Sequence, residues 1–274
     1  MRSRRRSYSK PSKGSATKQT LCKTYESLES YIADLNEGNY ERQSSMDTHR
    51  NDWSGSESFN HSVDNSRNGE DLGKLEVAIG QRERLHANIL DTFYNVSGSY
   101  VDIGMYLAHE PECMVDFQMS ENVKFAEINL NMTESCGTSS IVFFNKAVAT
   151  ATLVDELENN GYRVKLNVIG AVNVNDNKLA AVINVKQFSQ KLSIAQMTGC
   201  LSQGFFRRMF FAWVEKYCEK TCGLKPWDYG YGYPINFPVE GVTLPVTGGN
   251  LKTKEQVDAY VARALSMIKS EDND

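Results

Sequence analysis

The chain has 274 residues, of which 41% are hydrophobic, and this allows one large domain, or one domain with appendages, around a sizeable core. No apolar run approaches the roughly 18–20 residues needed to span a bilayer. No apolar stretch follows the basic N-terminus either, so the sequence predicts neither a membrane span nor a secretory signal. The six cysteines are scattered, which fits reduced thiols and a cytoplasmic location.

The net charge of −4 hides an uneven distribution. Residues 1–20 hold seven of the 30 basic side chains and no acidic one, so the remaining 23 basic and 34 acidic residues carry −11. We expect residues 1–20 to be a disordered basic arm, because they contain almost nothing to bury. An acidic body with such an arm is typical of proteins that touch nucleic acid or an acidic partner. The arm residues expected to contact nucleic acid are Arg2, Arg4, Arg5, Arg6 and Lys10.

Residues 21–98 are predicted to form a helical N-terminal extension. Apolar residues between Tyr25 and Leu35 repeat at three-and-four spacing, and Gly38 is a plausible stop. A second helical pattern covers residues 71–96, about 38 Å at 1.5 Å per residue. Its single apolar stripe means that this helix must lie against something, within the chain or on a second copy.

Residues 99–274 are predicted to form an α/β core domain. A strand at 123–131 is followed by a loop of small polar residues at 133–140, a helix at 141–160 and a strand at 162–169. A strand–helix–strand unit of this kind implies parallel strands with a right-handed crossover. The expected fold is therefore a mostly parallel sheet flanked by helices, a Rossmann-like sandwich.

The rest of the core continues this pattern. A further strand is expected at 179–185 and a long helix at 193–220. Residues 223–250 contain four of the six prolines and an aromatic–glycine run, which indicates an ordered loop or a set of short strands. Thr253 is expected to cap a last helix.

The segment around 124–160 resembles the first unit of a von Willebrand factor A-like domain. Such domains place a metal-binding D-x-S-x-S motif at the carboxyl end of the first strand, and the matching positions here are Asn131-Met-Thr133-Glu-Ser135. Asn replaces the first Asp and removes one negative charge that a hard divalent cation requires. The resemblance therefore implies an A-type fold with a degenerate site, rather than a cofactor.

A broader likeness is to an uncharacterised family of bacteriophage proteins. It rests on Trp53-Ser-Gly55, the stretch 101–114 and Phe205-Phe-Arg-Arg-Met-Phe-Phe211. That family has no activity to transfer. It implies a viral source and the cytoplasm of a host cell.

Two places are candidate ligand sites. His109, Glu112 and Cys113 are residue types that bind zinc and lie within one turn, although the alternative is a solvated turn shaped by Pro111. The loop 133–140 lies where parallel sheets bind ligands and precedes a helix N-terminus that suits an anion. Its alternative role is to cap that helix. The expected ligand-loop residues are Asn131, Thr133, Ser135, Thr138 and Ser139.

Two aromatic segments are candidate surfaces for single-stranded nucleic acid. Arg207 and Arg208 lie among phenylalanines, which we expect to pack in the core while the arginines face outward to phosphates. The second segment alternates aromatic residues with glycines, and its rings could stack on bases or fold over the sheet edge. Its aromatic residues are Trp227, Tyr229, Tyr231 and Tyr233.

No catalytic motif of known order occurs, so the sequence favours a binding protein without settling whether it is an enzyme. The first hypothesis is a non-enzymatic phage accessory protein that contacts single-stranded DNA in viral transcription or replication. The alternative is a protein-interaction module on a degenerate A-type domain, such as an assembly or host-takeover factor with a viral or host protein partner. The oligomeric state stays open.

Overall fold

The computed structural model describes residues 18–38, 40, 51–69, 72–80, 90–98, 100–119, 124–226 and 230–271. The basic arm residues up to Lys10, and also Trp227 and Tyr229, lie outside this range, so the predictions for them are not tested by the structure. Within the described residues, no helix is both long and apolar enough to cross a bilayer.

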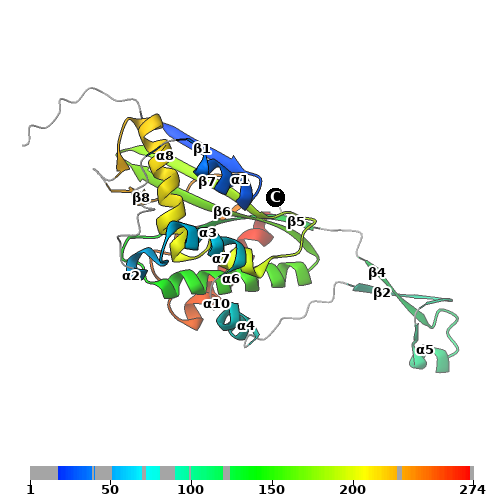
Figure 1. The fold of residues 1–274 in the computed structure, drawn as a ribbon. Coiled ribbons are helices and arrows are strands. Elements are labelled where there is room, and N and C mark those ends of the chain that lie inside the picture. Colours follow the sequence, from blue (N-terminus) through cyan, green and yellow to red (C-terminus); the bar gives the residue numbers. More distant parts are fainter. Residues whose placement is uncertain are drawn as a thin grey trace, which may run out of the picture.

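A mixed, mostly parallel sheet forms the centre of the fold (Figure 1). Its strand order is β1-β7-β6-β5-β9, and β8 pairs with the end of β6. The strands are β1 (Thr20–Tyr25), β5 (Lys124–Asn131), β6 (Tyr162–Val174), β7 (Asn177–Lys186), β8 (Tyr233–Pro234) and β9 (Val242–Leu244). Among these six strands, the pairs β6–β7 and β6–β8 are antiparallel and the others are parallel.

The predicted strand–helix–strand unit is confirmed. β5 and β6 are parallel neighbours, in register from Lys124 opposite Tyr162 to Asn131 opposite Ile169. The helix α6 (Ser140–Asn159) connects them. A two-residue turn at Asn175–Asp176, where both residues have positive φ, then reverses the chain into β7.

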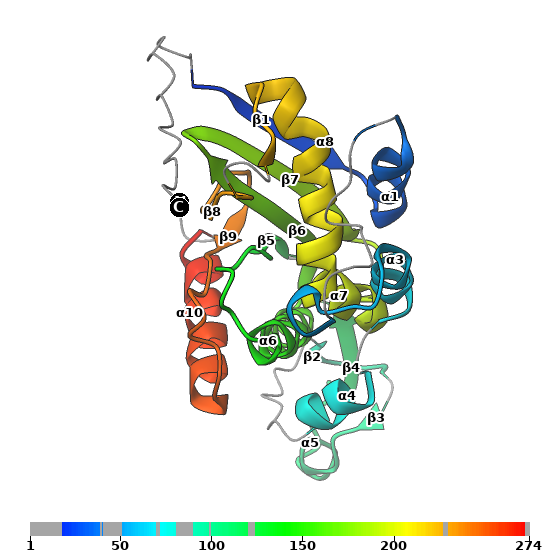
Figure 2. The ribbon, with the colours of Figure 1, turned by 60° about the vertical axis from the view of Figure 1, so that its left-hand side comes forward.

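Helices cover one face of the sheet (Figure 2). They include α6, α7 (Ile194–Cys200) and α8 (Phe211–Cys222), while α10 (Lys254–Glu271) packs on α6. The prediction of a single helix over 193–220 is wrong in detail, because the helix is interrupted after α7. The chain leaves α7 at Leu201, the Ser202 hydroxyl accepts from the Phe205 amide at 3.1 Å, and a π-helical turn (η1, Phe205–Phe210) leads into α8. Phe205, Phe206 and Phe210 are buried, as expected for a core stripe.

Asparagines line the other face, which the segment 235–239 covers. Asn184 donates to Asn167 Oδ1 at 2.9 Å, and Asn167 donates to Asn129 Oδ1 at 2.9 Å. Asn129 in turn donates to the carbonyl oxygen of Glu240 at 2.5 Å. This ladder ties three strands to Glu240, at the end of the covering segment, and each amide nitrogen in it donates to an oxygen.

The N-terminal extension is not purely helical, which corrects the prediction for residues 21–98. Thr20–Tyr25 forms β1, whose backbone pairs with the free edge of β7. The predicted helix is present as α1 (Leu28–Asn36), and Gly38 beyond it has a positive φ. α2 (Asn51–Ser54) and α3 (Phe59–Asn68) follow, and α3 packs on α7. The extension is thus part of the main fold.

The prediction of one long helix over 71–96 is also wrong. α4 (Leu72–Gly80) ends early, and Leu90–Asn95 is a strand, β2. Its Thr, Phe and Tyr residues favour a strand, and pairing with a segment more than twenty residues later decides the outcome.

We call residues 90–98 and 100–119 the projecting module. It is a small antiparallel sheet, in the order β2-β4-β3, with one short helix. Its remaining elements are β3 (Tyr100–Val101), α5 (Ile103–Leu107) and β4 (Met114–Met119). Figure 1 shows it extending away from the main sheet, beyond the start of β5.

Candidate functional site

The loop between β5 and α6 lies at a switch point of the sheet. From β5 the chain crosses to β6 on one side, whereas β9 lies on the other side and is parallel to β5. Ligands of open α/β sheets bind beyond the carboxyl ends of strands at such a point. The predicted ligand loop therefore occupies the expected position for a site.

The first two predicted ligand residues are directed inward. Asn131 and Thr133 are fully buried. Asn131 Oδ1 accepts from the Thr133 amide at 3.0 Å and lies 2.5 Å from its hydroxyl, while Asn131 Nδ2 donates to the Ile235 carbonyl at 2.7 Å. These contacts hold the loop in place, so both side chains are engaged in the interior.

A buried ion pair lies next to them. Glu134 Oε1 accepts from Lys146 Nζ at 2.6 Å, and both side chains are fully buried. The same oxygen accepts from the amide and the hydroxyl of Thr247, in the loop after β9, at 3.1 and 2.5 Å. Burial lowers the pKa of Lys146, and Glu134 opposes that shift. Lys146 also donates to the Asn131 carbonyl at 2.9 Å, so one ammonium joins α6 to the end of β5.

The residues do not fit the divalent cation of an A-type site. Asn131 is neutral and its oxygen already accepts from Thr133, while Glu134 is neutralised by Lys146. A hard cation needs several available anionic oxygens. The ion pair itself was not singled out from the sequence, because neither Glu134 nor Lys146 carries a local sign of burial.

The expectation that Arg207 and Arg208 face outward is wrong. They are only 3% and 1% exposed. Arg207 donates to the carbonyl oxygens of Cys136 and Thr138 at 3.0 and 2.9 Å, and also to that of Trp53. It therefore connects the ligand loop to the α2 segment. Arg208 likewise donates to the carbonyl oxygens of Ser56 and Glu57, at 2.8 and 3.2 Å. Neither arginine can reach a phosphate in this arrangement.

The outer surface of the loop is formed by small side chains beside one large ring. Trp53 is 42% exposed, and its Nε1 donates to the Cys136 carbonyl at 3.2 Å. Ser139 begins α6 with extended backbone, but its hydroxyl makes no capping hydrogen bond. Thr138 is buried, and its hydroxyl lies 3.0 Å from that of Ser135. We call the exposed group the β5 platform, and it consists of Trp53, Ser135, Cys136, Ser139 and Ile141.

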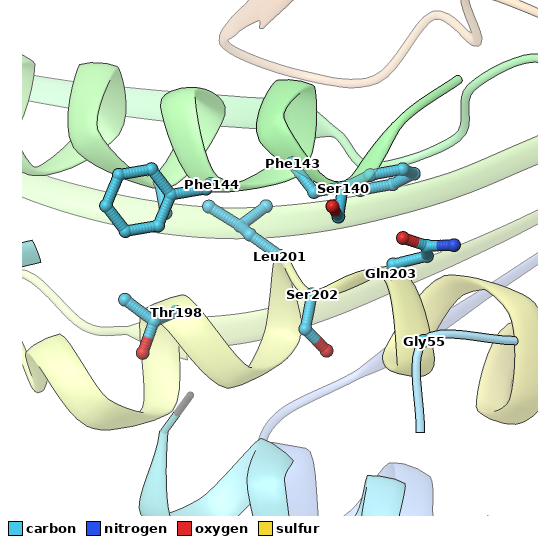
Figure 3. Close-up of a pocket in the computed structure, with 9 residues that line it drawn as sticks. Gly55, Ser140, Phe143, Phe144, Thr198, Leu201, Ser202 and Gln203 are labelled. Carbon is cyan, nitrogen blue, oxygen red and sulfur yellow. The ribbon is translucent and has the colours of Figure 1, made fainter. Parts of the chain in front are cut away.

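A small pocket opens beside the platform, between α6 and α7 (Figure 3). Phe143, Phe144 and Leu201 form its apolar wall, and Ser140 and Gln203 lie at the end near Gly55. Its volume of about 90 Å³ is small compared with the roughly 300–1,000 Å³ of typical ligand pockets. It has room for about one side chain.

The predicted zinc ligands are not brought together. His109 has a positive φ and is exposed in the turn after α5, as is Glu112, while Cys113 is half-buried. Across the described part of the chain, no three His, Cys, Asp or Glu side chains are close enough to hold a metal ion.

The aromatic–glycine segment contributes one free ring among its described residues. Tyr231 stacks on Phe211, with ring centres 4.0 Å apart, and its hydroxyl donates to Glu215. Burial raises the pKa of Tyr231, and Glu215 adds to this. Tyr233 is 81% exposed. Stacking on bases is thus open to Tyr233, whereas Tyr231 is committed to the fold.

A protein-family model described as "Domain of unknown function (DUF7192)" matches residues 9–272. A search of curated proteins and a search of solved structures found no match.

Proposed function

The chain belongs to this family of unknown function, and we propose from its geometry that it is a binding protein that holds another protein, viral or host, on the β5 platform. This proposal corresponds to the alternative hypothesis from the sequence, a protein-interaction module on a degenerate A-type domain. The likeness to A-type domains supports it, because β5, α6 and β6 have the order that this likeness implies and the loop lies at the carboxyl end of β5.

The anchoring of Trp53 is the observation that carries the proposal. The Arg207 guanidinium carbon lies 4.8 Å from the centre of the Trp53 ring. The Trp53 carbonyl accepts from Arg207 and, at 2.7 Å, from Gln203 Nε2. A tryptophan that is half exposed yet held in one position loses little entropy on binding, and tryptophan is enriched among residues that dominate interface energies.

The interior of the loop supports the same role. Asn131, Thr133 and Glu134 make internal contacts, so Ser135 and Cys136 are left on the surface in a fixed position. Small side chains let a partner approach the backbone closely. A rigid, shallow surface with one aromatic anchor suits a protein partner better than a small molecule.

The test is copurification from cells that naturally contain the protein. Wild type is compared with Trp53→Ala and Ser135→Trp, and with Lys191→Trp as a control in an exposed loop elsewhere. We expect one specific protein to copurify with wild type and the control, and its recovery to fall at least about tenfold with both platform variants. Equal recovery from all four proteins, or none from wild type, would contradict the proposal.

Contact with single-stranded DNA stays a prediction of the sequence. Among the described residues its support is the exposed ring of Tyr233. The measurement is fluorescence anisotropy with single-stranded DNA at about 50 mM salt, for wild type and Tyr233→Ser. We expect salt-sensitive binding that weakens in the variant. No binding at that salt concentration would remove this candidate.

A further inference from the structure

Exposed apolar side chains are concentrated in the projecting module. Of the twelve large apolar side chains that are exposed in the described residues, seven lie in this module. They are Tyr94, Val96, Tyr100, Val101, Ile103, Tyr106 and Leu107. A concentration of this kind marks an interaction site.

The charged side chains of the module are all acidic. Residues 90–119 contain five carboxylates and no lysine or arginine. Tyr94, Tyr100 and Tyr106 are exposed in the same module, and the Tyr94 hydroxyl donates to Asp102 at 3.1 Å. A carboxylate binds a guanidinium group with two hydrogen bonds. A tyrosine ring stacks on the flat face of a guanidinium group. The chemistry of this surface therefore matches an arginine-rich peptide.

The chain itself carries such a peptide. Residues 1–17 contain four arginines, two lysines and no acidic residue. We propose that the arginine-rich segment 1–17 of one copy of the protein binds the projecting module of a second copy. The partner is thus another molecule of this chain, recognised by its arginines.

The positions of the two parts in the fold favour contact between copies. β1 begins opposite Lys178, near the hairpin that ends β6, whereas the module precedes the start of β5, opposite Tyr162. These are opposite ends of β6, whose 13 residues span about 40 Å. To reach its own module, this segment would use most of the roughly 56–61 Å that 17 fully extended residues can span. A second copy can place its module next to the segment without requiring the segment to extend in this way.

Contacts of this kind join unlike surfaces, so they link copies head to tail into rings or chains. Because the attraction is largely ionic, the association weakens as salt increases. The proposal uses neither Trp53 nor Ser135, and it stands or falls independently of the β5 platform.

Two variants test the proposal, each removing one side of the contact. The segment variant is Arg4→Glu/Arg5→Glu/Arg6→Glu, and the module variant is Glu110→Lys/Glu112→Lys, at exposed positions on the turn before β4. Full-length proteins, treated with nuclease, are examined by size-exclusion chromatography with light scattering. We expect wild type to self-associate at about 50 mM salt and to dissociate at about 500 mM, and each variant alone to be monomeric.

A mixture of the segment variant and the module variant provides the decisive measurement. The two variants together still offer one intact segment and one intact module, so we expect a 1:1 complex at low salt. A chain that carries both sets of changes has its charges exchanged and should self-associate again. Monomeric wild type at low salt, self-association of either variant alone, or failure of the mixture to form a complex would each overturn the proposal.

Discussion

The Glu134 carboxylate accepts a hydrogen bond at 2.6 Å from the Lys146 ammonium, and neither side chain is exposed to solvent. The two residues lie on opposite sides of the ligand loop, at its start and on α6. Their pairing holds that loop against the end of the sheet. Removing one partner leaves an unpaired charge in the interior, which costs more than the pair contributes.

The first prediction concerns this pair. Lys146→Met should lower the free energy of unfolding by about 3–5 kcal/mol, because Glu134 then remains buried without its cation. The double variant Lys146→Met/Glu134→Gln should recover part of that loss. Urea denaturation measures both. The control, Lys165→Met, breaks the partly exposed pair with Glu127 and should cost less than about 1 kcal/mol.

The second prediction concerns Asp34, which joins α1 to α8. Burial alone would raise the pKa of Asp34, but hydrogen bonds from Tyr25, Lys23, Tyr217 and Lys216 together lower it well below its usual range. A carboxylate with a lowered folded-state pKa stabilises the protein above its unfolded pKa of about 3.9 and loses that contribution as the pH falls below it.

Asp34→Asn should therefore destabilise the protein by about 3–5 kcal/mol at pH 7, since Lys216 loses its buried partner. The difference from wild type should shrink below about pH 4, because Asp34 of the unfolded chain then takes up a proton while Asp34 of the folded protein stays ionised. Thermal unfolding between pH 3 and pH 7 measures this. A difference that stays constant over the whole range would contradict the assigned role.

The third prediction concerns Arg207. Arg207→Lys keeps the charge, but one ammonium group on a different stem cannot replace the guanidinium that spans the carbonyl oxygens of Cys136 and Thr138 in the ligand loop and of Trp53 in α2. We expect a loss of about 2–3 kcal/mol in stability, together with faster amide hydrogen exchange in residues 135–140. Arg263→Lys, at an exposed position on α10, is the matched control and should stay within about 0.5 kcal/mol of wild type.

The fourth prediction concerns the close contact of α3 and α7. A Cβ atom on Gly199 would lie 2.1 Å from the carbonyl oxygen of Asn65, so Gly199→Ala must separate the two helices. We expect a loss of about 1–3 kcal/mol. Gly73→Ala, on α4 with open space around it, should be neutral or stabilising by up to about 1 kcal/mol. Equal effects of the two changes in urea denaturation would show that α3 and α7 have room to adjust.

Local patterns explain which elements were predicted well. α6 is a long apolar segment that ends before Gly161, and β5 and β6 flank it, so this part follows from periodicity and the crossover rule. The segment 90–95 shows the limit of such patterns. Its apolar residues suit either a helix or a strand, and only the pairing of Leu90 with Met119 selects the strand.

The candidate site divides in the same way. Position along the chain was enough to identify the loop after β5 as a ligand loop. It could not show that Arg207 faces inward to Cys136 and Thr138, because the orientation of a side chain on a helix depends on what packs against that helix.

The sequence alone therefore determined the α/β class, the β5–α6–β6 unit and the position of the loop at the end of β5, since these depend on local hydrophobic periodicity and on chain order. Tertiary structure decided the place of β1 on the edge of β7, the internal pairing of Glu134 with Lys146 and the separate folding of the projecting module. These features depend on contacts between residues far apart in the chain, where burial and hydrogen bonding outweigh local preference.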